Sequence, residues 1–302
     1  MKILYGISLD NSIDVTTICF EKLARDNVII IPSDDSNRAS FFTDPLPGIL
    51  KKIIIVDDHR TTIYDAYTQV KINTKDNTTQ TTAHRVDNDA KIRYIHSKLK
   101  IKYGSLREEL PEQKMVARYL TGNEKVLEIG GNIGRNSLVI ASILEDNANF
   151  VTLECDINIA AQLIENRDLN NFNFHVETSA LSNRKLIQKG WDTTPSDTIL
   201  EGYSWVNTIT LHNLKAKYNI NFDTLVLDCE GAFYYILMDM PEILNNIKLI
   251  IMENDYHDIS TKKYIDYILV KNNFYVDYRE SGGWGPCFDN FFEVWKKILI
   301  QK

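Results

Sequence analysis

The segment 126–134 reads VLEIGGNIG, an apolar run that carries Glu128 and leads into a glycine-rich turn from Gly130 to Gly134. The next apolar run, 150–153, is followed directly by Glu154. A strand, a tight turn onto a helix N-terminus and a carboxylate after the next strand form the device by which open α/β folds hold a nucleotide-like cofactor, with the carboxylate on the ribose. The pattern therefore predicts a strand–turn–helix unit with a cofactor at the turn.

The residues of the turn indicate which cofactor it holds. In the dinucleotide-binding sequence G-x-G-x-x-G, the second glycine lets the backbone approach a pyrophosphate, but here that position is Asn132 and the third is Arg135. An asparagine side chain crowds a diphosphate and can instead hydrogen-bond a small zwitterion. Glu128 would repel a phosphate but can accept from an ammonium group, and no Gly-Lys-Ser/Thr follows to make a P-loop. The turn favours S-adenosylmethionine, bound by Glu128, Gly130, Asn132, Gly134 and Glu154.

Composition narrows the class of protein. Of the 302 residues, 44% are hydrophobic and 25% are charged, which is typical of a globular protein. The net charge of -7 gives no global attraction to nucleic acid or to an anionic membrane, so a nucleic-acid partner is not expected. The four cysteines have no metal-ligand spacing, and no stretch approaches the roughly 20 apolar residues of a membrane span. We expect reduced thiols and a cytoplasmic location.

Residues 1–72 differ in character from the rest of the chain. Short β-branched runs, most of them separated by turn residues, occur at 3–7, 15–20, 28–31, 52–56, 62–64 and 70–72. They predict a small β-rich accessory domain, a sandwich or a barrel. We expect its strand edges to serve in homo-oligomer formation or in capture of an acceptor. Residues 73–90 contain almost no large apolar side chain, and we interpret them as a polar linker.

From residue 91 to residue 302 the pattern predicts a methyltransferase-like α/β domain in which strands and helices alternate. Expected helices cover 106–120, 136–144, 157–169, 232–238 and 261–271, and expected strands cover 125–129, 150–153, 174–177, 224–227 and 249–252. The runs 274–278 and 291–295 are expected to pair antiparallel at one edge. Such alternation gives a doubly wound parallel sheet covered on both faces. With the antiparallel edge pair it is the Rossmann-like arrangement of class I methyltransferases.

Four blocks carry a resemblance to a known family. They are VLEIGGNIG at 126–134, Glu154 followed by Asn166 and Asn170, SALS at 179–182, and LDCEGA at 227–232. In order and spacing they resemble the FkbM family of S-adenosylmethionine-dependent O-methyltransferases, over residues 106–297. The resemblance implies that cofactor, and a sugar or glycan hydroxyl as the acceptor.

The chain departs from this family pattern at two positions and in one segment. Gly131 stands where the family usually has Ala, and Cys155 stands where it usually has Pro. The first change is harmless in a turn, and the second affects only the local turn after Glu154. The N-terminal segment lies outside the pattern and resembles arrangements in large nucleocytoplasmic DNA viruses.

Methyl transfer to a hydroxyl needs positioning and a base. Ser179 and Ala180 are expected beside the adenine, where Ala180 is small enough to let the ring approach. Asp228 and Glu230 follow the strand 224–227 at the carboxyl edge of the sheet, where ligands bind in such folds. We favour Asp228, also expected near the cofactor, as the base beside the methyl group. Glu230 is either a second catalytic group or a partner of the following helix N-terminus, and His257 is an alternative base.

Several carboxylates at one rim would suit a divalent cation, but no ligand pattern decides the matter. Trp191, Trp205 and Trp284 either line the acceptor pocket or serve in ordinary packing. The function predicted is O-methylation of a sugar or glycan hydroxyl. Two alternatives stay open: an RNA methyltransferase, which the acidic charge opposes, and a non-catalytic cofactor-binding or oligomerisation protein.

Overall fold

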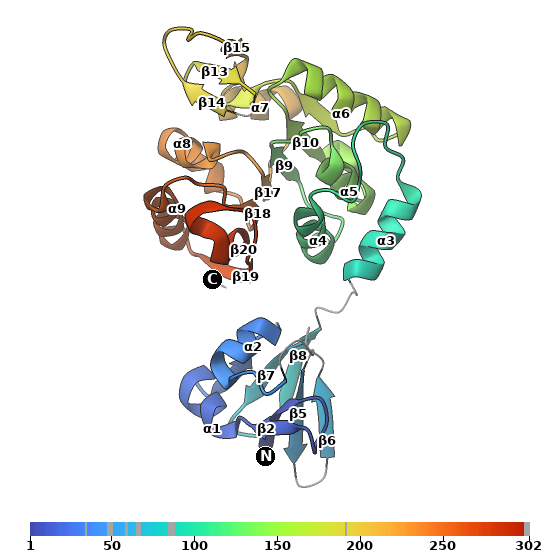
Figure 1. Cartoon of the computed structure of the whole chain (residues 1–302), viewed down its shortest axis with the longest axis vertical. Coiled ribbons are helices and arrows are strands. Elements are labelled where there is room, and N and C mark those ends of the chain that lie inside the picture. The colour runs from blue at the N-terminus through green and yellow to red at the C-terminus, as the bar shows by residue number, and fades with distance from the viewer. Residues whose placement is uncertain are drawn as a thin grey trace. The chain divides into compact units, whose positions relative to one another are not determined.

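The computed structural model describes residues 1–33, 35–46, 51–57, 60–64, 68–83, 88–190 and 192–298. The chain divides into two compact units, Met1–Asp87 and Asn88–Lys302. Figure 1 shows the helices and strands of each unit. In the described part of the chain, no helix combines the length and the apolar character needed to cross a bilayer.

The N-terminal unit consists of two antiparallel sheets that share one core. Their strand orders are β2-β1-β5-β6 and β3-β4-β7-β8. Ile3 and Ile53 of the first sheet and Ile29 and Val70 of the second are buried together with Phe42. The unit therefore has the predicted β-rich character. Its elements are β1 (Lys2–Gly6), β2 (Ser12–Asp14), α1 (Thr16–Ile18), η1 (Cys19–Leu23), β3 (Ala24–Arg25), β4 (Val28–Ile31), α2 (Asp35–Phe42), β5 (Lys52–Asp57), β6 (Arg60–Tyr64), β7 (Thr68–Asn73) and β8 (Thr79–Ala83).

Two expectations for this unit are corrected by the structure. Residues 16–20 of the expected strand 15–20 are helical. The N–H of Thr16 donates to Asp14 at 3.0 Å where the helical turn begins, a local contact that β-branched composition does not reveal. Part of the expected linker 73–90 is strand β8, which pairs with β7 as an edge strand. Thr79 and Gln80 are exposed there, which explains why the segment is polar without being a linker. Residues 84–87 lie outside the described residues.

The C-terminal unit has a central sheet flanked by two helical layers. The helix α3 (Asn88–Lys98) precedes the alternating part, in which the helices are α4 (Leu110–Tyr119), α5 (Arg135–Ile143), α6 (Ile157–Leu169), α7 (Leu211–Tyr218), α8 (Ala232–Asp239) and α9 (Ile259–Lys271). Side chains of α3 to α6 share one core and those of α7 to α9 share another, on opposite faces of the sheet. Short helices are η2 (Asn147–Asn149), η3 (Pro241–Leu244) and η4 (Gly285–Asn290).

Within the described residues the central sheet has seven strands in the order β11-β10-β9-β17-β18-β20-β19. They are β9 (Val126–Ile129), β10 (Phe150–Leu153), β11 (His175–Glu177), β17 (Thr224–Leu227), β18 (Leu249–Glu253), β19 (Phe274–Glu280) and β20 (Phe292–Lys297). The first five in the order run parallel, and β20 is antiparallel to both β18 and β19. The predicted doubly wound sheet with an antiparallel edge pair is therefore confirmed.

A smaller group of strands interrupts the alternation between β11 and β17. It comprises β12 (Ala180–Leu181), β13 (Leu186–Lys189), β14 (Asp192–Pro195), β15 (Ser204–Val206) and β16 (Thr208–Ile209). β13 pairs antiparallel with both β14 and β15. We call residues 186–206 the insert sheet, because it places side chains over the carboxyl edge of the central sheet.

Candidate active site

The site lies where the strand order of the sheet reverses. β9 and β17 are neighbours, and the chain proceeds from β9 toward β11 but from β17 toward β18, so their carboxyl ends open a crevice. The turn after β9 and the residue after β17 touch directly. A Cβ on Gly130 would lie 1.5 Å from the carbonyl oxygen of Asp228, and Gly130 has φ +92°. Only glycine fits there, and its absence of a side chain is what brings the two strand ends together.

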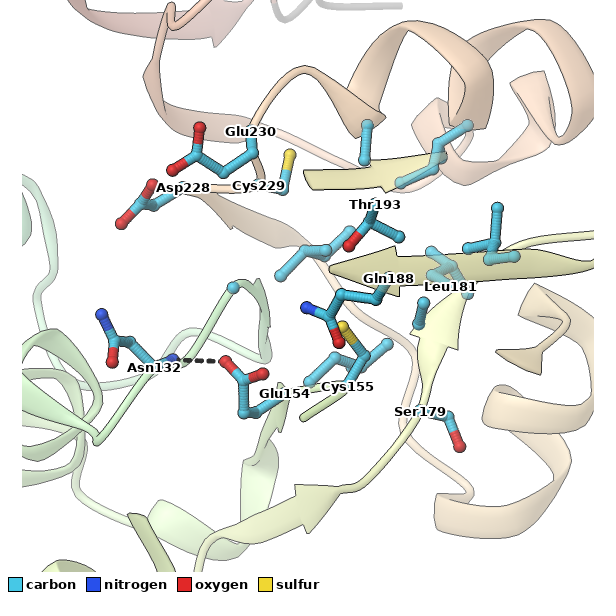
Figure 2. Close-up of a pocket in the computed structure, with 17 residues that line it drawn as sticks. Asn132, Glu154, Cys155, Ser179, Leu181, Gln188, Thr193, Asp228, Cys229 and Glu230 are labelled. Atoms are coloured by element: carbon cyan, nitrogen blue, oxygen red, sulfur yellow. Dashed lines mark hydrogen bonds between the residues drawn. The ribbon is translucent and has the colours of Figure 1, made fainter. Parts of the chain in front are cut away.

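A pocket of about 830 Å³, measured with its open mouth, occupies this crevice (Figure 2). Its walls come from the turn after β9, the ends of β10 and β17, the segment around β12, and the insert sheet. The lining residues are Ile129, Gly130, Asn132, Leu153, Glu154, Cys155, Ser179, Ala180, Leu181, Leu186, Gln188, Thr193, Asp228, Cys229, Glu230, Ala232 and Ile236.

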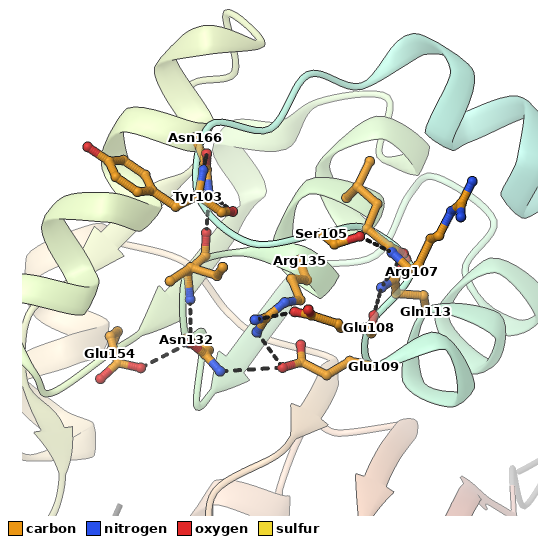
Figure 3. Close-up of polar contacts among 12 residues, drawn as sticks. Tyr103, Ser105, Arg107, Glu108, Glu109, Gln113, Asn132, Arg135, Glu154 and Asn166 are labelled. Carbon is orange, nitrogen blue, oxygen red and sulfur yellow. Dashed lines mark hydrogen bonds and ion pairs between the residues drawn. The ribbon is translucent and has the colours of Figure 1, made fainter. Parts of the chain in front are cut away.

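Glu154 follows β10 and connects the turn to the next helix. One of its oxygens accepts from the backbone N–H of Asn132 at 2.9 Å (Figure 3), and the other accepts from that of Asp156 at 2.8 Å. Burial raises the pKa of Glu154, while these two N–H groups act in the opposite direction. The side chain is 7% exposed and belongs to the pocket wall. The two backbone N–H groups hold the Glu154 side chain in place. Because a carboxylate has further lone pairs, Glu154 can still accept hydrogen bonds from a ligand.

Of the other predicted cofactor residues, some line the pocket and some lie outside it. Asn132, Ser179 and Ala180 line the pocket together with Gly130. Ser179 donates to Glu177 at 2.9 Å, which holds this segment at the end of β11. The structure thus brings residues from three separate sequence blocks to one pocket.

Glu128 and Gly134, which we predicted as cofactor ligands, do not line the pocket. The Glu128 side chain is 2% exposed and accepts from Ser137 and from Asn136, at the start of α5. Burial raises the pKa of Glu128 to about 7. Gly134 has φ +92° and is the N-cap of α5. Both residues anchor the helix that follows the turn. Glu128 points into the protein because both faces of its strand are covered.

Carboxyl groups gather beyond the end of β17. Burial, together with Glu109 and Glu112, raises the pKa of Asp228 well above its usual range. Burial and a hydrogen bond with Glu112 raise the pKa of Glu253 to about 11. Burial and a hydrogen bond with Glu230 raise the pKa of Asp255 to about 7. Near neutral pH these groups share protons, and a cation placed among them would favour their ionised forms.

Among the described residues, no group of three or more His, Cys, Asp or Glu side chains is arranged to hold a metal ion.

A second pocket lies at the same edge of the sheet and shares part of its wall with the first. The shared lining residues are Leu181, Leu186, Thr193, Glu230, Ala232 and Ile236.

The second pocket contains the third predicted catalytic residue. His257 lines it together with Asp255, Tyr234 and Tyr235, but does not line the first pocket. Arg184, an arginine of the same wall, donates to both carboxylate oxygens of Asp239 at 2.6 and 2.7 Å. The pocket therefore presents carboxylates and aromatic rings to a ligand.

The three tryptophans behave differently from one another. Trp191 lies outside the described residues. Trp205 of β15 is 49% exposed and belongs to neither pocket wall. Trp284 packs against His257, which lines the second pocket, with ring centroids 4.5 Å apart.

Some pocket residues have no counterpart in the sequence prediction. Gln188 of β13 and Thr193 of β14 project from the insert sheet over the first pocket. The strands of their segment are short and mix polar with apolar residues. The only sign of this extra structure in the sequence is the length of the chain between two predicted strands. Cys155 and Cys229, which also line the pocket and were not predicted, each follow a predicted acidic residue.

The strand order and the crevice define a Rossmann-like fold of the class I methyltransferase type. No family model matches the chain, and no curated protein sequence matches it. Similar solved structures include an O-methyltransferase from Bacillus cereus in complex with SAH, at 15% identity over 70% of this chain and 92% of that chain, with a TM-score of 0.40.

Two further solved structures show the same level of similarity. A ribosomal protein L11 methylase from Lactobacillus delbrueckii subsp. bulgaricus is 11% identical over 66% of this chain and 82% of that chain, with a TM-score of 0.40. A methyltransferase from Pyrococcus furiosus is 14% identical over 70% of this chain and 99% of that chain, with a TM-score of 0.39. Such similarity concerns the fold alone, and the fold assignment rests on the strand order of the sheet.

Proposed function

We propose that the protein is an S-adenosylmethionine-dependent O-methyltransferase of the FkbM type, acting on a hydroxyl of a sugar or glycan. One observation carries the proposal. The carboxylate that ends β10, Glu154, and the carboxylate that ends β17, Asp228, face the same pocket at the point where the strand order reverses. A second pocket adjoins it through a shared wall, which provides room for an acceptor.

The residues of the first pocket fit this cofactor. Glu154 can accept from ribose hydroxyls, and Ser179 and Ala180 belong to the same pocket wall. The side chain of Asn132 stands where a pyrophosphate would need bare backbone. The carboxyl cluster around Asp228 suits a cationic ligand, because a nearby cation favours the ionised forms of these groups. When bound, the cofactor would supply a methyl group on a positively charged sulfur, an already activated donor.

The chain's own residues provide positioning and a proton acceptor. Asp228 lines the first pocket, and its raised pKa makes its carboxylate a stronger base than an exposed aspartate. Glu230 lies in both walls and hydrogen-bonds Asp255. We assign Asp228 to take the proton of the acceptor hydroxyl, and the Glu230–Asp255 pair to hold a neighbouring hydroxyl.

The second pocket favours an uncharged acceptor. Glu230, Asp239, Asp255 and Asp258 are all in its wall, and its Arg184 is already bound to Asp239. A phosphate would meet carboxylates there, whereas sugar hydroxyls can donate to them and sugar C–H faces can pack on Tyr234 and Tyr235. These features support a sugar acceptor over RNA.

The experiment is mass spectrometry of neutral oligosaccharides incubated with the full-length protein and S-adenosylmethionine that carries an isotopically labelled methyl group. We expect one labelled methyl group on a hydroxyl, and none when the Asp228→Asn protein replaces the wild type. Transfer to RNA but not to sugars would favour the RNA methyltransferase alternative. Absence of any binding of the cofactor would favour the non-catalytic one.

We further propose a cytoplasmic protein that forms a homo-oligomer through its N-terminal unit. The four cysteines are unpaired, as expected of a reducing compartment. β6 and β8 are edge strands of their sheets and offer free backbone groups for pairing. Light scattering of the full-length chain is expected to give the mass of a dimer or a larger assembly, and a monomeric mass would contradict this proposal.

A further inference from the structure

The second pocket has a buried inner part and an exposed rim. Asp255, which hydrogen-bonds Glu230, is 6% exposed, whereas His257 and Asp258 of the same segment are exposed. All four residues line this pocket. The segment that follows β18 therefore leads from the inside of the pocket to its mouth.

Trp284 continues this rim outside the pocket. It comes from the loop between β19 and η4, and its indole packs on the exposed ring of His257 with centroids 4.5 Å apart. Although it contacts His257, Trp284 is 42% exposed. An aromatic ring that stays open to solvent beside the mouth of a pocket can hold the apolar C–H face of a sugar.

Two glycines fix the backbone on either side of Trp284. Gly283 and Gly285 have φ of +55° and +74°, a region that side chains disfavour. A Cβ on Gly283 would lie 2.2 Å from the ring of Phe291, so the absence of a side chain lets the loop lie directly on that ring. The position of the indole is therefore set by the backbone of its loop and does not require burial of the indole itself.

Asn254 ties this loop to the pocket segment. It is fully buried and shortly precedes His257 in the chain. Its backbone N–H donates to the carbonyl of Phe291 at 2.7 Å, and its side-chain amide donates to the carbonyl of Asn290 at 2.6 Å. The segment that carries His257 and the loop that carries Trp284 are thus held together at their bases.

We propose that Trp284 is the platform for a second sugar residue, so that the acceptor is an oligosaccharide or a glycan chain and not a free monosaccharide. This inference rests on the proposed function. The sugar that receives the methyl group lies in the second pocket against the Glu230–Asp255 pair, and its neighbour in the chain stacks on the open side of Trp284. The rim carboxylate of Asp258 favours a neutral neighbour over an acidic one, because like charges repel.

The test compares acceptors that have one sugar with acceptors that have two. The substrates are neutral disaccharides of glucose, galactose, mannose and xylose, and the methyl glycosides of the same sugars, in which a methyl group replaces the second ring. Steady-state kinetics of the full-length protein with S-adenosylmethionine are expected to give wild type a lower KM for a disaccharide than for its methyl glycoside.

Replacing Trp284 by alanine should remove this preference. The KM for the disaccharide is expected to rise roughly 3- to 10-fold, the effect of one lost aromatic contact. The kcat for the disaccharide and both constants for the methyl glycoside should stay within about twofold of wild type, because a separate subsite adds nothing to them.

Three further variants make the test specific. Trp284→Tyr keeps an aromatic face and should retain most of the preference for disaccharides. Trp284→Leu keeps apolar bulk without a ring and should behave as Trp284→Ala does. Trp205→Ala removes a tryptophan of similar exposure, 49%, that lines neither pocket, and should leave every constant unchanged. Because both tryptophans are exposed, all of these variants should melt close to the wild-type temperature.

The outcomes separate the subsite from the function on which it rests. If wild type methylates both kinds of acceptor with the same KM, or if Trp284→Ala changes both kinds alike, the subsite is overturned while the methyltransferase function stands. A lower kcat on both kinds of acceptor would overturn it in favour of a role for Trp284 in positioning His257. If wild type methylates none of these sugars, the proposed acceptor is wrong and the subsite is overturned with it.

Discussion

Replacing Glu154 by alanine should abolish useful cofactor binding. Two ribose hydroxyls lose a charged acceptor, and each charge-assisted hydrogen bond contributes about 1.5–3 kcal/mol, so the dissociation constant should rise roughly 100-fold or more. The backbone N–H of Asn132 also loses its partner, which loosens the turn itself. Titration calorimetry with S-adenosylhomocysteine measures the effect.

Two other variants calibrate this result. Glu154→Gln keeps the shape and one oxygen acceptor but loses the charge, and should fall between wild type and Glu154→Ala. Glu242→Ala removes an exposed carboxylate in η3 that lines neither pocket, and should bind as wild type does. If the affinity of Glu154→Ala for S-adenosylhomocysteine is within threefold of that of wild type, the assignment of Glu154 to the ribose is wrong.

Asp228→Asn should leave binding largely intact and remove turnover. An amide cannot take the proton of the acceptor hydroxyl, and loss of a general base typically costs about 10²–10⁴ in rate. The cofactor affinity should change only a few-fold, because Glu154 and the turn stay in place. Single-turnover rates and calorimetry on the same protein separate the two effects. Wild-type turnover in this variant would require another base, for which His257 in the adjoining pocket is the alternative.

The same substitution should make the protein more stable, increasingly so at higher pH. The pKa of Asp228 is raised in the folded state, by burial and by neighbouring carboxylates. Above the unfolded pKa, the unfolded chain releases this proton while the folded chain retains it, so the group lowers stability as pH rises. Asparagine removes that penalty. Asp228→Asn and wild type should therefore melt at similar temperatures at pH 4, and the variant should melt at a higher temperature than wild type at pH 8. Equal melting temperatures at both pH values would argue against a raised pKa of Asp228 in the folded protein.

The parts of the fold that the sequence predicts are those with strong local signals. The bounds of β10, α6 and β17 match the predicted ranges residue for residue, because each is an uninterrupted apolar or periodic run. Asp156 additionally caps α6 through the N–H groups of Asn158 and Ile159. The segment 15–20 and β8 were misread because β-branched content competes with capping in the first and polarity hides edge pairing in the second. The insert sheet was missed because its strands are too short to show a period.

The site residues, like the elements of the fold, include some that the sequence predicts and some that it does not. Glu154, Asp228 and Glu230 could be placed from sequence because each follows a strand, and parallel strands end at one edge. Glu128 lies outside the pocket wall because its side chain points into the covered sheet, a direction that the same argument ignores. Gln188 reaches the pocket from a segment with no local mark, through tertiary contacts that only the folded chain reveals.

The contact between Gly130 and the Asp228 carbonyl has a consequence for redesign of this protein. Since even a methyl group at residue 130 would displace the end of β17, the turn proposed to hold the cofactor and the proposed base share one rigid joint. Under the proposed function, a change to that turn should shift the base as well, whereas changes of acceptor preference are better sought in the insert sheet, which lies outside the joint.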